Sequence, residues 1–250
     1  MKVIFHEDFY RVYTSDPAAA AGRMEAIVEE IEPRAEYISA EPATEEQIAL
    51  AHDARHIESV RNSGLYDIAA LAAGGAIQAA TIGLTEPCFG LIRPPGHHAS
   101  ADSCWGFCYF NNMAVALAVL KAQGAIKTAY VLDVDLHFGD GTVNILGGRD
   151  GIEVHNVEAG NRILYLDQVS NEMSACEADI IGISAGFDYH QEDWGGLLAT
   201  EDYFEIGHMV RKAARRIGGG YFAILEGGYN HDVLGANALA LINGMSEQEI

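Results

Sequence analysis

The sequence predicts one α/β domain in three layers, with helices on both faces of a mainly parallel sheet. Four runs of apolar and β-branched residues are nearly continuous, as expected for strands covered on both faces; they span residues 89–92, 128–133, 179–184 and 221–225. Helical patterns separate these runs, which implies right-handed crossovers between parallel strands. The 250 residues are 49% apolar, enough for one core without disulfides or repeats, so we expect residues 1–250 to form a single domain.

The helices are expected at residues 44–60 in two pieces, 66–83, 112–123 and 201–217. Thr44 and Gln47 have the spacing of a capping box, which marks the start of the first helix. Thr200, followed by two acidic residues, is the expected N-cap of the last helix, and the run of three glycines from Gly218 ends it.

The charge balance argues against nucleic acid as a partner. The chain has 36 acidic and 15 basic residues, a net charge of −21, whereas nucleic-acid binders present basic patches that displace counterions. The basic residues at 211–216 have helical spacing and are interpreted as one solvated helix face. An acidic exterior is also able to attract cationic substrates.

The cysteines and the apolar segments favour a cytoplasmic protein that does not enter a membrane. The four cysteines form no C-x-x-C pair, which is typical of a reduced cytosolic chain. The first residues become charged after a very short apolar run, too short for a signal-peptide core. Residues 68–84 are almost uncharged but contain several glycines and polar residues, so we expect a buried helix there.

Chemically active residues follow each of the four predicted strands. Residues 93–98 read Arg-Pro-Pro-Gly-His-His, residues 133–137 read Asp-Val-Asp-Leu-His, Asp188 follows the third strand, and residues 226–229 read Glu-Gly-Gly-Tyr. Ligands bind at the carboxyl ends of strands in open parallel sheets. These four segments therefore predict a functional site at one edge of the sheet.

Three of these residues have the character of a catalytic metal centre. Asp135 and His137 project to the same side of an extended segment, and Asp188 comes from another strand end. Three oxygen and nitrogen ligands leave one coordination position open, as in catalytic zinc sites. Zn2+ suits this donor set best, and Fe2+ or Co2+ is also chemically acceptable.

The neighbouring residues indicate the reaction. His97 and His98 need carboxylate partners to fix their tautomers, and Asp133 and Asp140 are available. Tyr229 follows two glycines and is able to direct its hydroxyl at a developing oxyanion. A metal that activates water, a histidine that transfers the proton and a tyrosine that donates to the oxyanion together favour metal-assisted amide hydrolysis.

The motifs also resemble a known family. The segments at residues 93–99, 106–112, 133–141, 184–188 and 226–230 resemble, in order and separation, those of histone deacetylases and acetylpolyamine amidohydrolases, with the match running from about Ala43 onward. The chain looks like a short, prokaryotic-type member. The resemblance implies the arginase/deacetylase fold and an acylated amine as substrate, either a small molecule or a peptide lysine.

The resemblance also implies a role for each site residue. Zinc would be bound by Asp135, His137 and Asp188. His98, held by Asp140, would be the general base and acid, and His97, oriented by Asp133, would act electrostatically. Tyr229 would donate to the transition state, Gly106 and Phe107 would line the acyl tunnel, and K+ would bind near Asp133.

Several positions depart from the family pattern. Phe138 stands where a second histidine is usual, and we expect it to pack rather than to catalyse. Residues 142–178 and 63–69 are short where loops usually supply a tunnel aromatic and an acidic substrate contact, which leaves Asp67 as a weak candidate. Trp194 replaces a usual Pro-Leu pair and is expected to supply part of the missing bulk. The site would then be unusually open, or completed by a second subunit of a homo-oligomer.

Three other interpretations remain open at this point. Residues 182–186 match G-x-S-x-G, so Ser184 could be the nucleophile of a serine hydrolase, although a loop rather than a helix is expected after it. A ureohydrolase with two manganese ions would share the fold but would need further ligands near His97. A degenerate deacetylase would bind metal or acyl-lysine without turnover.

Overall fold

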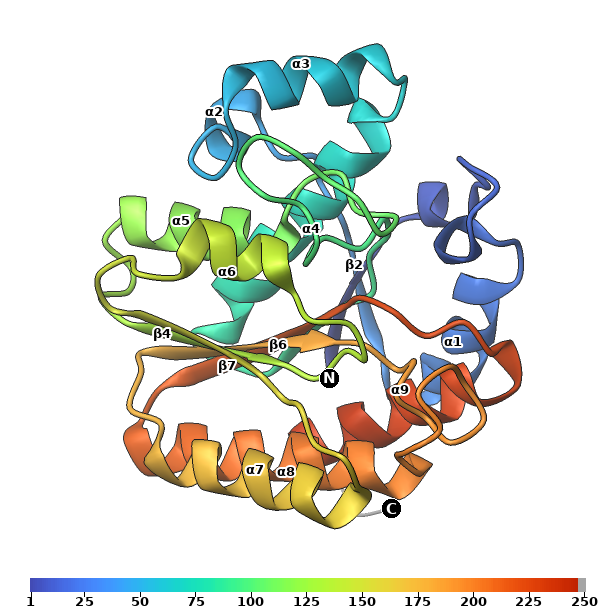
Figure 1. Ribbon diagram of the computed structural model, residues 1–250, viewed down its shortest axis with the longest axis vertical. Coiled ribbons are helices and arrows are strands. Elements are labelled where there is room, and N and C mark those ends of the chain that lie inside the picture. The colour runs from blue at the N-terminus through green and yellow to red at the C-terminus, as the bar shows by residue number, and fades with distance from the viewer. Residues whose placement is uncertain (247–250) are drawn as a thin grey trace.

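The computed structural model describes residues 1–246 and is built around a seven-stranded sheet in the order β2-β1-β3-β7-β6-β4-β5 (Figure 1). Every pairing between neighbouring strands is parallel. The strands are β1 (Lys2–Phe5), β2 (Glu36–Ser39), β3 (Cys88–Gly90), β4 (Ala129–Asp133), β5 (Ile152–Asn156), β6 (Ile180–Ala185) and β7 (Gly220–Leu225).

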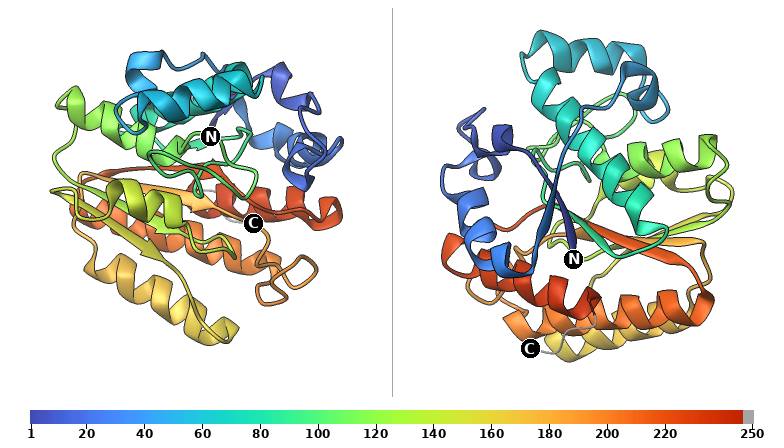
Figure 2. Two further views of the ribbon diagram at one scale, coloured as in Figure 1. Left: turned by 45° about the horizontal axis from the view of Figure 1, so that its top comes forward. Right: turned by 180° about the vertical axis from the view of Figure 1, so that it is seen from behind.

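Helices cover both faces of the sheet and complete the predicted three layers. The α-helices are α1 (Arg23–Ile31), α2 (Glu45–Ile48), α3 (Ala54–Asn62), α4 (Tyr66–Gly83), α5 (Asn112–Ala122), α6 (Asp140–Leu146), α7 (Arg162–Ala175), α8 (Thr200–Ile217) and α9 (His231–Met245). Short 3-10 helices span Glu7–Tyr10, Pro17–Ala19 and Glu32–Arg34. Helices α4, α5 and α6 lie on one face and α7, α8 and α9 on the other, and α1 packs beside α9 (Figures 1 and 2).

The four predicted strands correspond to β3, β4, β6 and β7, with ends shifted by one or two residues. Every residue of β4 and β6 is buried, which explains why these runs lack an alternating pattern. The sequence analysis missed β1, β2 and β5. The first two are only four residues long, and β2 at the sheet edge is mostly exposed, so neither has a strong apolar pattern.

The predicted helices are present, and α1, α6, α7 and α9 are additional. The capping box of Thr44 and Gln47 is confirmed at the start of α2. The N-cap prediction at Thr200 is wrong: the cap is Ala199, whose N–H donates to the Asp202 carboxylate at 2.8 Å. Gly218 ends α8 in the left-handed region, with φ 69°, as expected for a glycine C-cap.

Helix α4 is the buried, nearly uncharged helix expected at residues 68–84. A Cβ atom at Gly74 would collide with the carbonyl oxygen of Glu41. The absence of a side chain therefore lets α4 pack directly against the loop between β2 and α2. Among residues 1–246, no helix combines the length and the apolarity that a membrane crossing needs.

The strand order explains where the functional residues meet. Strands β3, β7, β6 and β4 are consecutive neighbours in the sheet, so their carboxyl ends lie side by side at one edge. The segments that follow them are the four motif segments of the sequence. The topology therefore brings residues far apart in the chain to one place, as the sequence analysis expected.

Candidate metal centre and active site

Asp135, His137 and Asp188 come together at the ends of β4 and β6, as predicted. One ligand atom from each lies within 4.8 Å of the others, and His137 Nδ1 is 2.9 Å from Asp188 Oδ2 and 3.2 Å from Asp135 Oδ1. Both aspartates are buried, whereas His137 is partly exposed. Backbone N–H groups of His137 and Gly227 donate to Asp135 at 2.9 and 2.8 Å, which fixes its carboxylate.

The surroundings of these three residues fit a bound cation. Oδ2 of Asp188 is buried, and its polar neighbour at 2.9 Å is His137 Nδ1, which is itself one of the three candidate ligands. Burial and the nearby charge of Asp135 raise the pKa of Asp188 to about 7, so the negative charge is poorly compensated. A Cβ atom at Gly227 would lie 2.6 Å from Asp135 Oδ2 and 2.8 Å from Asp188 Oδ2, so a glycine here keeps the space beside both carboxylates clear.

His97 and His98 are each oriented by the carboxylate that the sequence analysis assigned to it. His97 Nδ1 is 3.0 Å from Asp133 Oδ2, and His98 Nδ1 is 2.7 Å from Asp140 Oδ1. Both histidines are buried, and their ring centroids are 4.0 Å apart. Because Nδ1 of each ring is paired with a carboxylate, Nε2 is the nitrogen left for chemistry.

The two histidines have pKa values that move in opposite directions. Burial lowers the pKa of His97, but the charges of Asp135 and Asp133 outweigh it and raise the pKa well above 6.5. Burial and the neighbouring His97 lower the pKa of His98 to about 4, against the opposing effect of Asp140. One ring is thus favoured as a cation and the other as a neutral base.

Asp140 connects His98 to a residue that the sequence analysis did not single out. Partial burial raises the pKa of Asp140, but hydrogen bonds from Trp105 and His98 outweigh it and lower the pKa. Trp105 Nε1 donates to both carboxylate oxygens of Asp140, at 2.9 and 3.2 Å. Asp140 is therefore ionised and accepts hydrogen bonds from two side chains.

Two buried charged residues behind the site were not predicted to have a role. Glu226 Oε2 accepts from the backbone N–H groups of Gly96 and His97 at 2.6 and 3.2 Å, and burial raises the pKa of this carboxyl to about 7. Arg23 of α1 donates to the carbonyl oxygens of Gly228 and Glu226 at 2.8 and 2.7 Å. Together they fix the two turns that carry the histidines and Tyr229.

Tyr229 is held by aromatic contacts on several sides. Its ring stacks on Trp194 with centroids 4.1 Å apart and an interplanar angle of 27°, and meets Phe107 edge-on at 6.0 Å. The Arg23 guanidinium lies 5.6 Å from the ring centroid. Burial raises the pKa of the Tyr229 hydroxyl, so this group stays protonated and able to donate. The expectation that Trp194 adds bulk to the site is confirmed.

Gly106 and Phe107 form a tight turn next to His98. Their φ angles are +58° and +66°, and Phe107 is the one non-glycine residue with positive φ in residues 1–246. A Cβ atom at Gly106 would collide with the His98 ring. The left-handed conformation is unfavourable for a bulky residue, so the surrounding contacts must maintain it at Phe107.

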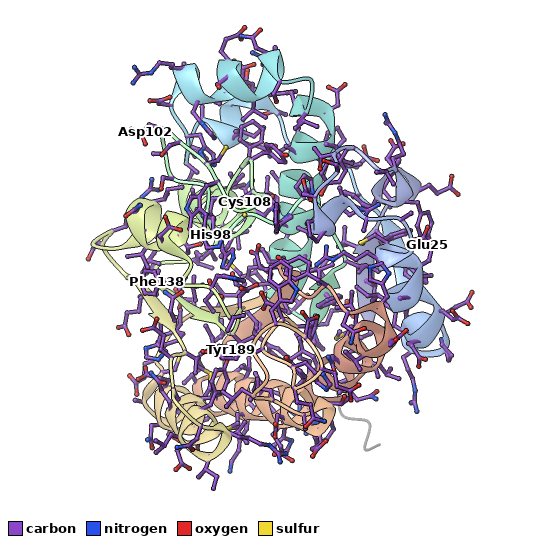
Figure 3. All side chains as sticks on the ribbon, turned by 45° about the vertical axis from the view of Figure 1, so that its right-hand side comes forward. Glu25, His98, Asp102, Cys108, Phe138 and Tyr189 are labelled. Atoms are coloured by element: carbon purple, nitrogen blue, oxygen red, sulfur yellow. The ribbon has the colours of Figure 1, made fainter. Side chains whose placement is uncertain are left out.

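The prediction that Phe138 packs is wrong: this residue is 47% exposed. The chain bends at residues 135–137 after β4 ends, and beyond this bend His137 faces Asp135 and Asp188 whereas the Phe138 side chain is exposed. Figure 3 shows Phe138 toward the outside of the molecule and His98 further in.

The two regions that the sequence analysis found short, residues 63–69 and 142–178, contain short connections in the structure. Residues 63–65 join α3 to α4, and residues 157–161 join β5 to α7. Asp67, the weak candidate for a substrate contact, is exposed in the first turn of α4. The loops expected in relatives are thus replaced by tight connections on these sides of the fold.

The structure does not favour the serine hydrolase interpretation. Ser184 lies within β6, is fully buried and has an Oγ with no hydrogen-bond partner in the described residues. A nucleophile elbow instead exposes its serine on a turn between strand and helix. Within residues 1–246, the grouping of Asp135, His137 and Asp188 is the one set of three or more side chains found able to hold a metal.

Comparison with known proteins decides the family. The family model described as the histone deacetylase domain matches residues 17–159 and 158–245. The chain belongs to the histone deacetylase family. The match begins well before Ala43, so the similarity to the family covers more of the chain than the motifs indicated. The sequence analysis missed this N-terminal part because it contains no strong motif.

Two relatives and one solved structure show the extent of the similarity. The chain is 27% identical over 308 residues to a probable deacetylase of Methanothermobacter thermautotrophicus, covering 99% of the chain and 91% of the relative. It is 29% identical over 194 residues to acetylpolyamine amidohydrolase 1 of Pseudomonas aeruginosa, covering 62% and 55%. The crystal structure of the HDA15 HD domain matches with a TM-score of 0.83 at 25% identity, covering 97% and 88%.

These matches confirm the predicted arginase/deacetylase fold of this family member. The alignment to the Methanothermobacter deacetylase is longer than the 250 residues of this chain, so the chain lacks segments that this relative has. This agrees with the short connections at residues 63–65 and 157–161.

Proposed function

We propose that this chain is a zinc-dependent amidohydrolase that removes acetyl or related acyl groups from amines. The observation that carries the proposal is the juxtaposition of two carboxylate-paired histidines with the group of Asp135, His137 and Asp188. Family membership supports deacetylase chemistry, and the donor set supports zinc, with Fe2+ or Co2+ as the next best fit.

Asp135, His137 and Asp188 would hold the ion, one per chain. A divalent ion held there would supply Lewis-acid polarisation of the amide carbonyl and would make water a better nucleophile at neutral pH. The protein's own contribution is to keep the ligands in place. The N–H groups of Gly227 and Leu136 do this for the two aspartates, at 2.8 and 3.0 Å.

His98 is the proposed general base and acid. Its Nδ1 is paired with Asp140, so Nε2 is free to accept a proton from the attacking water and to return it to the leaving amine. Such proton transfer contributes roughly 10²–10⁴-fold to the rate. His97, held by Asp133, is proposed to act electrostatically on the charge that develops beside it.

Tyr229 is the proposed donor to the oxyanion of the tetrahedral state. Its hydroxyl stays protonated, and Trp194 and Phe107 hold its ring, so the donor needs little reorganisation. Phe107, with Gly106, is proposed to line the passage for the acyl group. Trp194, whose ring stacks on Tyr229, is proposed to extend that wall.

The proposed substrate is an acylated amine, either a small molecule or a peptide lysine. The named activities of the relatives support this class, and the net charge of −21 favours substrates that carry a further positive charge. Potassium binding near Asp133, cytoplasmic location and assembly into a homo-oligomer remain predictions, as does the absence of nucleic-acid and membrane partners.

A substrate screen tests the proposal. Metal-reconstituted protein is incubated with acetyl-lysine peptides, N-acetylpolyamines and longer acyl amides, and the released amine is measured. We expect hydrolysis of at least one class, lost with a chelator and unaffected by a fluorophosphonate. Labelling of Ser184 with loss of activity would instead indicate a serine hydrolase. Full metal occupancy without turnover of any amide would indicate a non-catalytic binding protein.

A further inference from the structure

Trp105 makes two different contacts with the proposed proton-transfer pair, although it is 56% exposed. Its ring lies against the His98 ring with centroids 3.9 Å apart and an angle of 32° between the planes. Its indole Nε1 donates to Asp140 Oδ2 at 2.9 Å and to Oδ1 at 3.2 Å. One side chain therefore contacts the base through its ring and the base's carboxylate partner through its N–H.

The position of Asp140 explains why a second donor matters. The Asp140 side chain is 37% exposed, whereas that of His98 is 4% exposed, so water competes for this carboxylate but not for the imidazole. Asp140 Oδ1 is the oxygen that pairs with His98 Nδ1 at 2.7 Å. A donor at both oxygens restricts rotation of the carboxylate, and hydrogen bonds to an ionised acceptor are among the stronger ones.

The backbone next to Trp105 is shaped to make these contacts. The positive φ angles of Gly106 and Phe107 turn the chain around the edge of the His98 ring. Gly106 has no Cβ, and any other residue there would collide with that ring. The turn therefore places Trp105 over one side of His98 while Phe107 meets Tyr229.

We propose that Trp105 is a positioning residue for His98. Its N–H holds the Asp140 carboxylate in the orientation that pairs with His98 Nδ1, and its ring keeps the imidazole from tilting, so that Nε2 stays directed at the reacting atoms. The inference rests on the proposed amidohydrolase function for its effect on rate. The contact itself is independent of that function.

The first test separates the N–H from the ring. Trp105→Phe keeps an aromatic ring beside His98 and removes the donor, and Tyr37→Phe is the matched control at the exposed edge strand β2. We expect Trp105→Phe to lower kcat about tenfold, as for loss of one hydrogen bond to a charged group, with KM, metal content and melting temperature unchanged. An unchanged kcat, or a rise in KM alone, would overturn the proposal.

A double-mutant cycle then tests whether Trp105 acts through Asp140. In an Asp140→Ala background the indole has no carboxylate to hold. Adding Trp105→Phe is therefore expected to change kcat less than twofold, about the change seen when a substitution has lost its interaction partner. The same tenfold loss in both backgrounds would show that Trp105 acts by another route and would contradict the inference.

A measurement without turnover distinguishes failure of this inference from failure of the proposed function. The chain has two tryptophans, so the zinc-loaded protein should give two indole N–H signals by NMR, assigned with Trp105→Phe and Trp194→Phe. We expect Asp140→Ala to shift the Trp105 signal alone, and Trp105→Phe to speed solvent exchange of the His98 Nδ1 proton. Unchanged signals would refute the positioning role. If the two variants change these signals as expected but the wild-type protein hydrolyses no amide, the positioning contact is supported and the proposed function is refuted.

Discussion

Removing the Tyr229 hydroxyl is the sharpest perturbation of the proposed chemistry. The contacts that hold this residue involve its ring or its backbone: the stack on Trp194, the edge contact with Phe107, and the N–H donated to Asp193 at 2.7 Å. Phenylalanine keeps all of them. Tyr229→Phe therefore deletes one hydrogen-bond donor and leaves the surrounding packing intact.

The expected loss follows from the role of an oxyanion donor. Removing one such donor costs about 10²–10³ in kcat, equivalent to about 2.7–4 kcal/mol of transition-state stabilisation. The donor acts on charge that forms only in the transition state, so KM should change little. Steady-state hydrolysis of the best substrate measures kcat and KM, and elemental analysis should find the same metal content as in wild type.

Two results would refute this reasoning. Unchanged kcat in Tyr229→Phe would remove the hydroxyl from the mechanism. A fall in metal content or melting temperature that matched the loss of rate would show that Tyr229 supports the structure rather than the reaction.

The other predictions concern the metal, the base and a buried histidine. Asp188→Ala should lose the ion by elemental analysis, because one of three ligands is gone. His98→Ala should keep its metal but lose roughly 10²–10⁴ in kcat; wild-type rates would assign the base elsewhere. Burial and the neighbouring His56 lower the pKa of His52 from 6.5 to about 4, and its Nε2 accepts the Asn111 N–H at 2.8 Å. As the pH falls, His52 is protonated in the unfolded chain at a higher pH than in the folded one. The free energy of unfolding should therefore fall by about 3 kcal/mol as the pH is lowered from 6.5 to 4. Denaturant titration should show a smaller fall in His52→Gln.

The sequence was most informative where chemistry and local pattern coincide. The buried runs of β4 and β6 end directly at Asp133 and Ala185, so the placement of the ligands followed from the ends of apolar segments. The sequence analysis expected an extended chain to place Asp135 and His137 on one side, and the structure instead brings them together through bends at residues 135–137. The need of a histidine for an oriented tautomer predicted only that Asp133 and Asp140 would serve His97 and His98, and the family resemblance implied which carboxylate pairs with which histidine.

Residues whose role depends on distant contacts could not be predicted. Arg23 reaches the carbonyl of Gly228 across 205 positions of sequence, and no local pattern around α1 indicates this. No sequence pattern marks Trp105 as functional. Its contacts with His98 and Asp140 depend on the left-handed turn at Gly106 and Phe107. Phe138 lies in the irregular segment between β4 and α6, where no local pattern indicates whether its side chain is buried or exposed.

A metal titration coupled to activity tests the central claim most directly. Protein stripped with a chelator is titrated with Zn2+, and bound ion and hydrolysis of an acylated amine are measured on the same samples. The proposed chemistry predicts no amide hydrolysis without metal and a rate that rises until one ion is bound per chain. Asp188→Ala should neither bind the ion nor gain activity when Zn2+ is added. Hydrolysis by the metal-free protein, or a rate that needs two ions per chain, would contradict it.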